Sequence, residues 1–211
     1  MQELNLIHRV RLPGADTGAP CPVIVMVHGW LGNENVMWVF EKTLPPLVVV
    51  VSPRGPFEAD GGYGWSAGQS DAATFEQGLS ALRDFVVRLP DVYLVDAGRL
   101  LLMGFSQGAA VSYALALKHP ELVSGVVALA GFLPEQARLW LAPGRLAGKH
   151  IFIAHGVKDE TAPVGDARQA REALEFAGAD VSYHEYLVGH KLSALGMRDL
   201  KHWLASRVKP A

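Results

Sequence analysis

The sequence predicts an α/β fold with a mostly parallel central sheet and helices on both faces. Short segments rich in Val, Ile and Leu alternate with segments of helical periodicity, and several of the short segments are apolar at every position. Strands that are apolar on both faces are typical of parallel sheets, which helices cover through right-handed crossovers. With 211 residues, half of them hydrophobic, the chain is expected to form one domain over 1–211 without a large cap domain.

Seven segments are candidates for the strands. The first and last of them, 4–12 and 181–187, alternate between apolar and polar residues, which indicates strands at the edges of the sheet. The five apolar candidates for buried strands are 23–27, 47–51, 100–103, 123–130 and 150–154.

Three further segments show the spacing of amphipathic helices. The first begins behind Ser70-Asp71, which are good N-cap residues, and is expected to end at Pro90. The second is bracketed by Pro163 and Gly178, and the third covers about 192–208.

Composition limits the classes of partner. The net charge is −2 and no block of Lys or Arg occurs, so neither nucleic acid nor an anionic membrane surface is expected to bind. A single cysteine, Cys21, excludes an internal disulfide and suits a reducing compartment, and it lacks the spacing of a metal ligand. The first residues lack the apolar run of a secretory signal and no run has membrane-spanning length, so a cytoplasmic protein without stable membrane insertion is expected.

The most informative motif is Gly104-Phe105-Ser106-Gln107-Gly108, between an apolar run and a helix-forming one. Gly-x-Ser-x-Gly in this context is the nucleophile elbow, where small neighbours let strand and helix approach closely enough to hold the serine in a strained turn. Two glycines in five residues also occur by chance, but here the flanking strand and helix patterns match the context that the motif requires. The motif predicts that Ser106 is a catalytic nucleophile.

A serine hydroxyl needs a general base, and the base needs a third group that orients it. In folds with a nucleophile elbow, the order along the chain is serine, acid, histidine. Asp159 follows the strand 150–154 and is the candidate acid, although an ordinary turn aspartate would look the same. His190 follows the last strand and is the candidate base, whereas His184 and His202 lie in strand and helix patterns typical of structural histidines.

Acyl transfer also requires N–H donors for the developing oxyanion. One is expected to be the backbone amide of Gln107, directly after the nucleophile and at a helix start. The other is expected from the loop after the strand 23–27, where the amide of Trp30 is the best candidate. His28 is expected to orient this loop rather than to titrate during catalysis.

Together these pieces resemble, over nearly the full length, the phospholipase/carboxylesterase family of α/β-hydrolases, which includes acyl-protein thioesterases and small bacterial carboxylesterases. The specific pieces are the His28-Gly29 loop, the Gly-Phe-Ser-Gln-Gly elbow, His155-Gly156-x-x-Asp159 followed by Pro163, and Gly189-His190. The stretch 53–65 is more similar to bacterial members than to eukaryotic thioesterases. The resemblance implies an α/β-hydrolase fold and a serine hydrolase, without metal or cofactor, that cleaves small-molecule carboxylic esters or thioesters of short to medium acyl chains.

Two long irregular stretches, 52–69 and 131–149, are expected to shape the substrate site, as long loops in compact domains commonly do. Their large apolar residues Trp65, Phe132 and Leu133 are candidates for substrate binding, as the lining of the acyl pocket. Such side chains also bury well as local packing, which is the alternative for each of them.

Other readings of the chain stay open. Lysophospholipase and acyl-thioesterase activity are alternatives on the same scaffold. A non-catalytic ligand-binding protein is the alternative of another class, because a fold does not fix a function. Such proteins usually lack a member of the triad, whereas all three candidates are present here. The apolar loop 132–146 can equally serve as a lid or as a contact in a homodimer.

Overall fold

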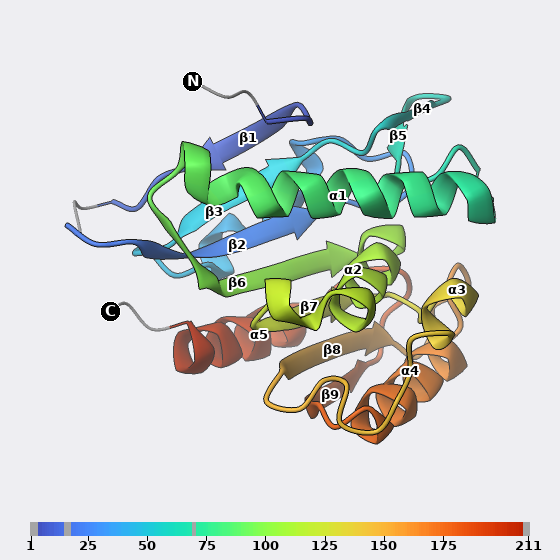
Figure 1. Ribbon diagram of the computed structural model, residues 1–211. Helices are drawn as coiled ribbons and strands as arrows, with labels where there is room; N and C mark the ends of the chain where they lie inside the picture. The colour runs from blue at the N-terminus through green and yellow to red at the C-terminus, as the bar shows by residue number, and fades with distance from the viewer. Residues whose placement is uncertain (1–3, 15–17, 69–70, 209–211) are drawn as a thin grey trace.

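A seven-stranded sheet forms the centre of the computed structural model, which describes residues 4–14, 18–68 and 71–208 (Figure 1). The strand order is β1-β3-β2-β6-β7-β8-β9, and every neighbouring pair is parallel except β1 with β3. The mostly parallel sheet with β1 and β9 at its edges confirms the prediction. The strands are β1 (His8–Arg11), β2 (Cys21–Val27), β3 (Val49–Pro53), β6 (Val95–Phe105), β7 (Gly125–Leu129), β8 (His150–Gly156) and β9 (Asp180–Tyr186).

Helices cover both faces of the sheet, as the alternation of side chains in β2 illustrates. Val23, Val25 and Val27 join one apolar cluster with residues of α1, α2 and α4, whereas Ile24 and Met26 join a second cluster with residues of η1 and α5. The helices are η1 (Val36–Thr43), α1 (Ala72–Val92), α2 (Gln107–Lys118), η2 (Pro120–Leu122), α3 (Glu135–Arg138), α4 (Val164–Phe176) and α5 (Ala194–Arg207).

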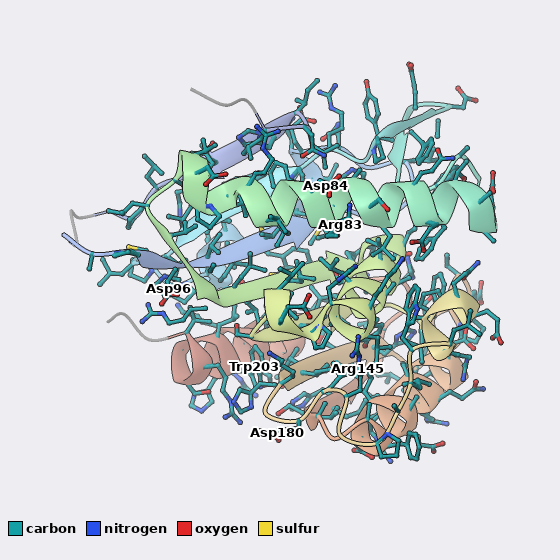
Figure 2. All side chains as sticks on the ribbon, viewed as in Figure 1. Arg83, Asp84, Asp96, Arg145, Asp180 and Trp203 are labelled. Atoms are coloured by element: carbon teal, nitrogen blue, oxygen red, sulfur yellow. The ribbon has the colours of Figure 1, made fainter. Side chains whose placement is uncertain are left out.

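Figure 2 labels side chains on helices from both faces of the sheet. Trp203 projects from α5, and its ring centroid lies 5.6 Å from that of Phe152 in β8, within the second cluster. Arg83 and Asp84 lie on α1 and form an exposed ion pair there.

The helix ends follow from local chemistry, with one correction. The Asp71 side chain caps α1 by accepting hydrogen bonds from the amides of Ala73 and Thr74, while Ser70 lies outside the described residues. The helix does not end at Pro90 but continues to Val92. A proline in the last turn removes only one intrahelical hydrogen bond, and the next turn still closes through the amide of Tyr93 on the carbonyl of Leu89.

Three other segments differ from the sequence prediction. The stretch 131–149, expected to be irregular, contains the short helix α3. The stretch 52–69 is not wholly irregular, because it contains the hairpin β4 (Phe57–Ala59) and β5 (Gly62–Gly64). The 3₁₀ helix η1 was not predicted, since its eight residues are too few for a clear helical repeat.

The topology brings chemistry-bearing loops to one edge of the sheet. Loops that follow the parallel strands all emerge at the carboxyl ends of those strands, the usual place of ligand sites in open α/β sheets. Three of these loops carry Trp30, Ser106 and His190, after β2, β6 and β9 respectively. Among the helices of the described residues, none combines the length and the hydropathy that a membrane span requires.

The core packing predicts the effect of truncating α1. Leu82 is fully buried against the sheet, so Leu82→Ala is expected to lower the free energy of unfolding by about 2–5 kcal/mol. Val87 on the same helix is 52% exposed, and Val87→Ala is expected to change the free energy of unfolding by less than about 0.5 kcal/mol. Urea denaturation of both variants measures the difference, and equal losses would contradict the assignment of the buried face.

Candidate active site

Ser106 occupies a strained turn between β6 and α2. Its backbone angles are φ 53° and ψ −119°, a conformation that residues with a Cβ rarely adopt. Such strain costs on the order of 1–3 kcal/mol and persists only where the surroundings enforce it. The turn points the side chain out of the sheet edge at the amino end of α2, as the nucleophile elbow requires.

The two glycines of the motif allow the close packing that enforces this turn. A Cβ on Gly104 would overlap the backbone of Gly108, and a Cβ on Gly108 would overlap the carbonyl oxygen of Val27 at the end of β2. The elbow is therefore clamped between two neighbouring strands and its own helix. Gly131 contributes in the same way, because a Cβ there would overlap the Cβ of Ala109.

Asp159 and His190 form a hydrogen-bonded pair beside the elbow. His190 Nδ1 lies 2.7 Å from Asp159 Oδ2, and the other carboxylate oxygen accepts the amides of Thr161 and Ala162, each at 2.9 Å. Burial raises the pKa of Asp159, but these hydrogen bonds outweigh it and hold the pKa below its ordinary value. The carboxylate is thus ionised at neutral pH and directs the Nδ1–H of His190 towards itself.

His190 lies beside the residues that form the elbow. Ser106 and His190 line the same cavity, and the ring of His190 packs edge-on against Phe105 with centroids 5.0 Å apart. Among the described residues no hydrogen bond joins the serine hydroxyl to the histidine, and such bonds are often long until substrate binds. The structure thus brings together all three residues predicted from the sequence.

A second histidine, His155, lies behind the carboxylate. Its side chain is fully buried, with Nε2 donating to the carbonyl of Ala162 at 2.8 Å and lying 3.4 Å from Asp159 Oδ2. Its Nδ1 has no hydrogen-bond partner in the described part of the chain. His155 therefore braces the turn 159–162 from the inside.

The loop after β2 is held by His28. The buried ring accepts the amide of Gly55 on Nε2 at 2.8 Å, so Nδ1 carries the hydrogen and donates to the carbonyl of Gly29 at 2.7 Å. Burial lowers the pKa of His28, which keeps the ring neutral in this role. As expected from the sequence, this histidine orients the loop.

The hairpin β4–β5 supports the same loop from the other side. Tyr63 donates its amide to the carbonyl of Gly32, and Arg54 makes a two-pronged ion pair with Glu34 at 2.7 and 2.9 Å. That pairing lowers the pKa of Glu34 to about 2. Arg54 therefore ties two loops together.

Trp30 and Gln107, the predicted oxyanion donors, both line a cavity that Ser106 also lines. Gln107 is the first residue of α2, and Trp30 lies in the turn closed by the amide of Gly32 on the carbonyl of Gly29. No acceptor among the described residues is bonded to either amide, which leaves both available to a ligand atom near Ser106.

Two of the predicted pocket residues belong to the core. The indole of Trp65 is fully buried and donates to the carbonyl of His28, while its amide donates to the side chain of Gln107. Leu133 is 6% exposed and packs in the first apolar cluster. Neither lines a cavity at Ser106, which corrects the expectation that they contact substrate: hydrogen bonding and burial hold both side chains inward.

Two cavities meet at Ser106. The larger, of about 540 Å³, runs between η1 and the start of α5 and is mostly apolar. The smaller, of about 250 Å³, lies on the other side of Ser106, and Phe132 is part of its wall. Trp30 and Thr161 border both. The residues of η1, of α5 and of the loop just before α5 that line the larger cavity are Val36, Met37, Val39, Phe40, Met197 and Leu192.

Sequence reasoning missed these lining residues. The apolar spacing of Val36, Met37 and Phe40 was the available signal, because it places three large side chains on one side of a short helix. As regards metals, no three His, Cys, Asp or Glu side chains are grouped to hold an ion in residues 4–14, 18–68 and 71–208.

Solved structures with the same architecture show the class of fold. A carboxylesterase from Bacillus cereus superposes with a TM-score of 0.86 at 24% identity, covering 96% of this chain and 95% of that one. A carboxylesterase from Mesorhizobium loti superposes with a TM-score of 0.82 at 20% identity, covering 97% of each chain. Fold and elbow together define an α/β-hydrolase without a large cap, as predicted.

Sequence comparison then gives the family. The family model described as phospholipase/carboxylesterase matches residues 16–208. The chain is also 28% identical to acyl-protein thioesterase 1 of Debaryomyces hansenii, in a match covering 97% of this chain and 99% of that protein. The chain belongs to the phospholipase/carboxylesterase family, which confirms the resemblance noted in its motifs.

The buried His28 predicts a pH dependence of stability. Its folded-state pKa lies below the ordinary value of about 6.5, so the unfolded chain binds a proton at this residue more readily than the folded chain. Stability from His28 is therefore present above about pH 6.5 and is lost as pH falls towards the folded-state pKa.

Urea unfolding of wild type and His28→Gln tests this dependence. Because glutamine gains no proton, the difference in unfolding free energy between the two should shrink from about pH 7.5 to about pH 5.5. A difference that stayed constant over this range would show that His28 does not titrate on unfolding.

Proposed function

We propose that this protein is a serine hydrolase that cleaves carboxylic esters of short to medium acyl chains through an acyl-serine intermediate. The observation that carries the proposal is the strained Ser106 facing a cavity that it shares with His190, whose Nδ1 is bonded to the buried Asp159. This is the set of parts that acyl transfer requires, in the chain order usual for this fold.

In the proposed mechanism, Ser106 Oγ attacks the substrate carbonyl while His190 Nε2 accepts its proton. Asp159 stabilises the imidazolium and keeps it oriented, and the amides of Trp30 and Gln107 donate to the oxyanion. The ester C–O bond then breaks, and His190 passes the proton to the departing alcohol oxygen. Water activated by His190 attacks the acyl-serine and releases the carboxylic acid.

The larger cavity suits the acyl chain. Its wall is mostly apolar, with several side chains from η1, and its volume of about 540 Å³ lies within the usual range of small-molecule sites. An apolar wall favours burial of methylene groups and offers few partners to polar substituents, which supports substrates with an unsubstituted acyl chain. In this proposal neither metal nor cofactor takes part.

Thioester hydrolysis is the second candidate, favoured by the relative named acyl-protein thioesterase 1. The same nucleophile, base and oxyanion donors serve both reactions, so site geometry does not discriminate between them. Acyl-CoA thioesters and p-nitrophenyl esters of matched acyl length compare the two directly.

Substitution of the nucleophile tests the proposal itself. Ser106→Ala is expected to reduce hydrolysis of p-nitrophenyl esters, over a graded series of acyl lengths, by about 10⁴-fold or more. A fluorophosphonate probe should label wild type and not the variant, with unchanged circular dichroism as the control. Absence of labelling in folded wild type would favour a non-catalytic binding protein.

Substitution of Asp159 tests the orientation of His190 while the nucleophile Ser106 stays in place. Asp159→Asn preserves an oxygen for the amides of Thr161 and Ala162 but offers an N–H to His190, which favours the wrong tautomer. We expect kcat to fall by up to about 10⁴-fold. Steady-state kinetics with p-nitrophenyl butyrate measures this loss, and an unchanged kcat would place the acid elsewhere.

A further inference from the structure

The smaller cavity differs from the larger one in its chemistry. It lies beside Ser106 on the side away from η1 and has a volume of about 250 Å³. Polar and apolar groups contribute to its wall about equally, whereas apolar groups dominate the larger cavity. Its lining residues are Trp30, Ser106, Gln107, Phe132, Thr161, Ala162 and Asp166.

Asp166 is the one ionisable residue of this wall apart from the serine itself. It lies in the first turn of α4 and is half-buried. Its carboxylate has no hydrogen-bond or ion-pair partner among the described residues, unlike that of Asp159. An acidic residue in a first helical turn is common, because the helix dipole favours it. That preference accounts for the residue type but not for its place on the wall of a cavity at the nucleophile.

Two aromatic residues complete the wall from separate loops. Trp30 follows β2 and Phe132 follows β7, and both border the cavity that Asp166 borders. Aromatic faces attract cations, and a carboxylate does so over a longer range. No Lys or Arg lines this cavity, so a cation beside Asp166 would meet no positively charged side chain, whereas an anion beside Asp166 would be repelled by the carboxylate.

We propose that the smaller cavity binds a positively charged alcohol portion of the substrate, so that the enzyme prefers esters of apolar acids with amino alcohols or quaternary ammonium alcohols. This inference rests on the proposed esterase function and assigns the two cavities to the two halves of the ester. The acyl chain occupies the larger, apolar cavity, and the cationic alcohol lies against Asp166. The ester oxygen remains at Ser106, where the cavities meet and where His190 delivers the proton to the departing alcohol.

A pair of isosteric esters tests the assignment. Butyrylcholine and 3,3-dimethylbutyl butyrate have the same shape but differ in the charge of the alcohol. Wild type should show a kcat/KM for butyrylcholine about five- to tenfold above that for the neutral ester, as expected for a partly exposed cation site. In Asp166→Asn this ratio should fall towards one, and raising the salt concentration should lower it in wild type.

Glu172→Gln is the matched control, because it removes one negative charge from an exposed position of the same helix. Its substrate ratio should equal that of wild type. If Glu172→Gln lowered the ratio as much as Asp166→Asn, the effect would come from the overall field of the helix and the assignment would be overturned.

Inhibition by the free alcohols gives a second measurement. Choline should inhibit hydrolysis of p-nitrophenyl butyrate more strongly than 3,3-dimethyl-1-butanol, and Asp166→Asn should reduce the difference. A ratio near one in wild type, or a ratio indifferent to Asp166→Asn, overturns the inference. If hydrolysis of p-nitrophenyl butyrate depends on Ser106 but the two isosteric esters are hydrolysed equally well, this inference alone is wrong. If no ester is hydrolysed at all, the proposed function is wrong.

Discussion

The strained backbone of Ser106 is the constraint on which the rest of the site depends. The turn is held because Gly104, Gly108 and the end of β2 approach more closely than any Cβ would permit. Parallel strands bring their carboxyl ends to one edge, so the same packing that forces the serine outward also brings the loops after β2, β8 and β9 around it. The stability of the whole fold offsets the cost of this strained backbone. The chemistry at Ser106 therefore depends on the packing of apolar clusters that lie far from the nucleophile.

The loops around Ser106 are held by buried polar contacts rather than by apolar packing alone. His28 bridges the loop after β2 to Gly55, and His155 braces the turn that carries Asp159. The side chain of Gln107 joins the elbow to Trp65 and to the hydroxyl of Ser66. Each contact satisfies a polar group that burial would otherwise penalise, which makes these loops rigid supports for a reacting centre.

Much of the fold and of the three-residue centre followed from the sequence, because the signals there are local. Apolar runs defined the strands, and the spacing of Gly104, Ser106 and Gly108 defined the elbow. The walls of the cavities did not follow so well. Whether Trp65 faces substrate or core depends on partners about forty residues away, such as Gln107, and no periodicity reports such a contact. The short helix η1 escaped notice for the opposite reason, since its eight residues are too few for a repeat.

Thr161 contributes both to the support of the acid and to the walls of the cavities. Its amide holds the carboxylate of Asp159, and it also borders both cavities. A change of shape here would alter which molecules fit and, through the same backbone, the tautomer of His190. By contrast, Val36 and Val39 line a cavity from a helix that makes no bond to the reacting groups. Selection for new substrates, in nature or in the laboratory, should therefore accumulate replacements along η1 and leave the turn beside the acid almost untouched.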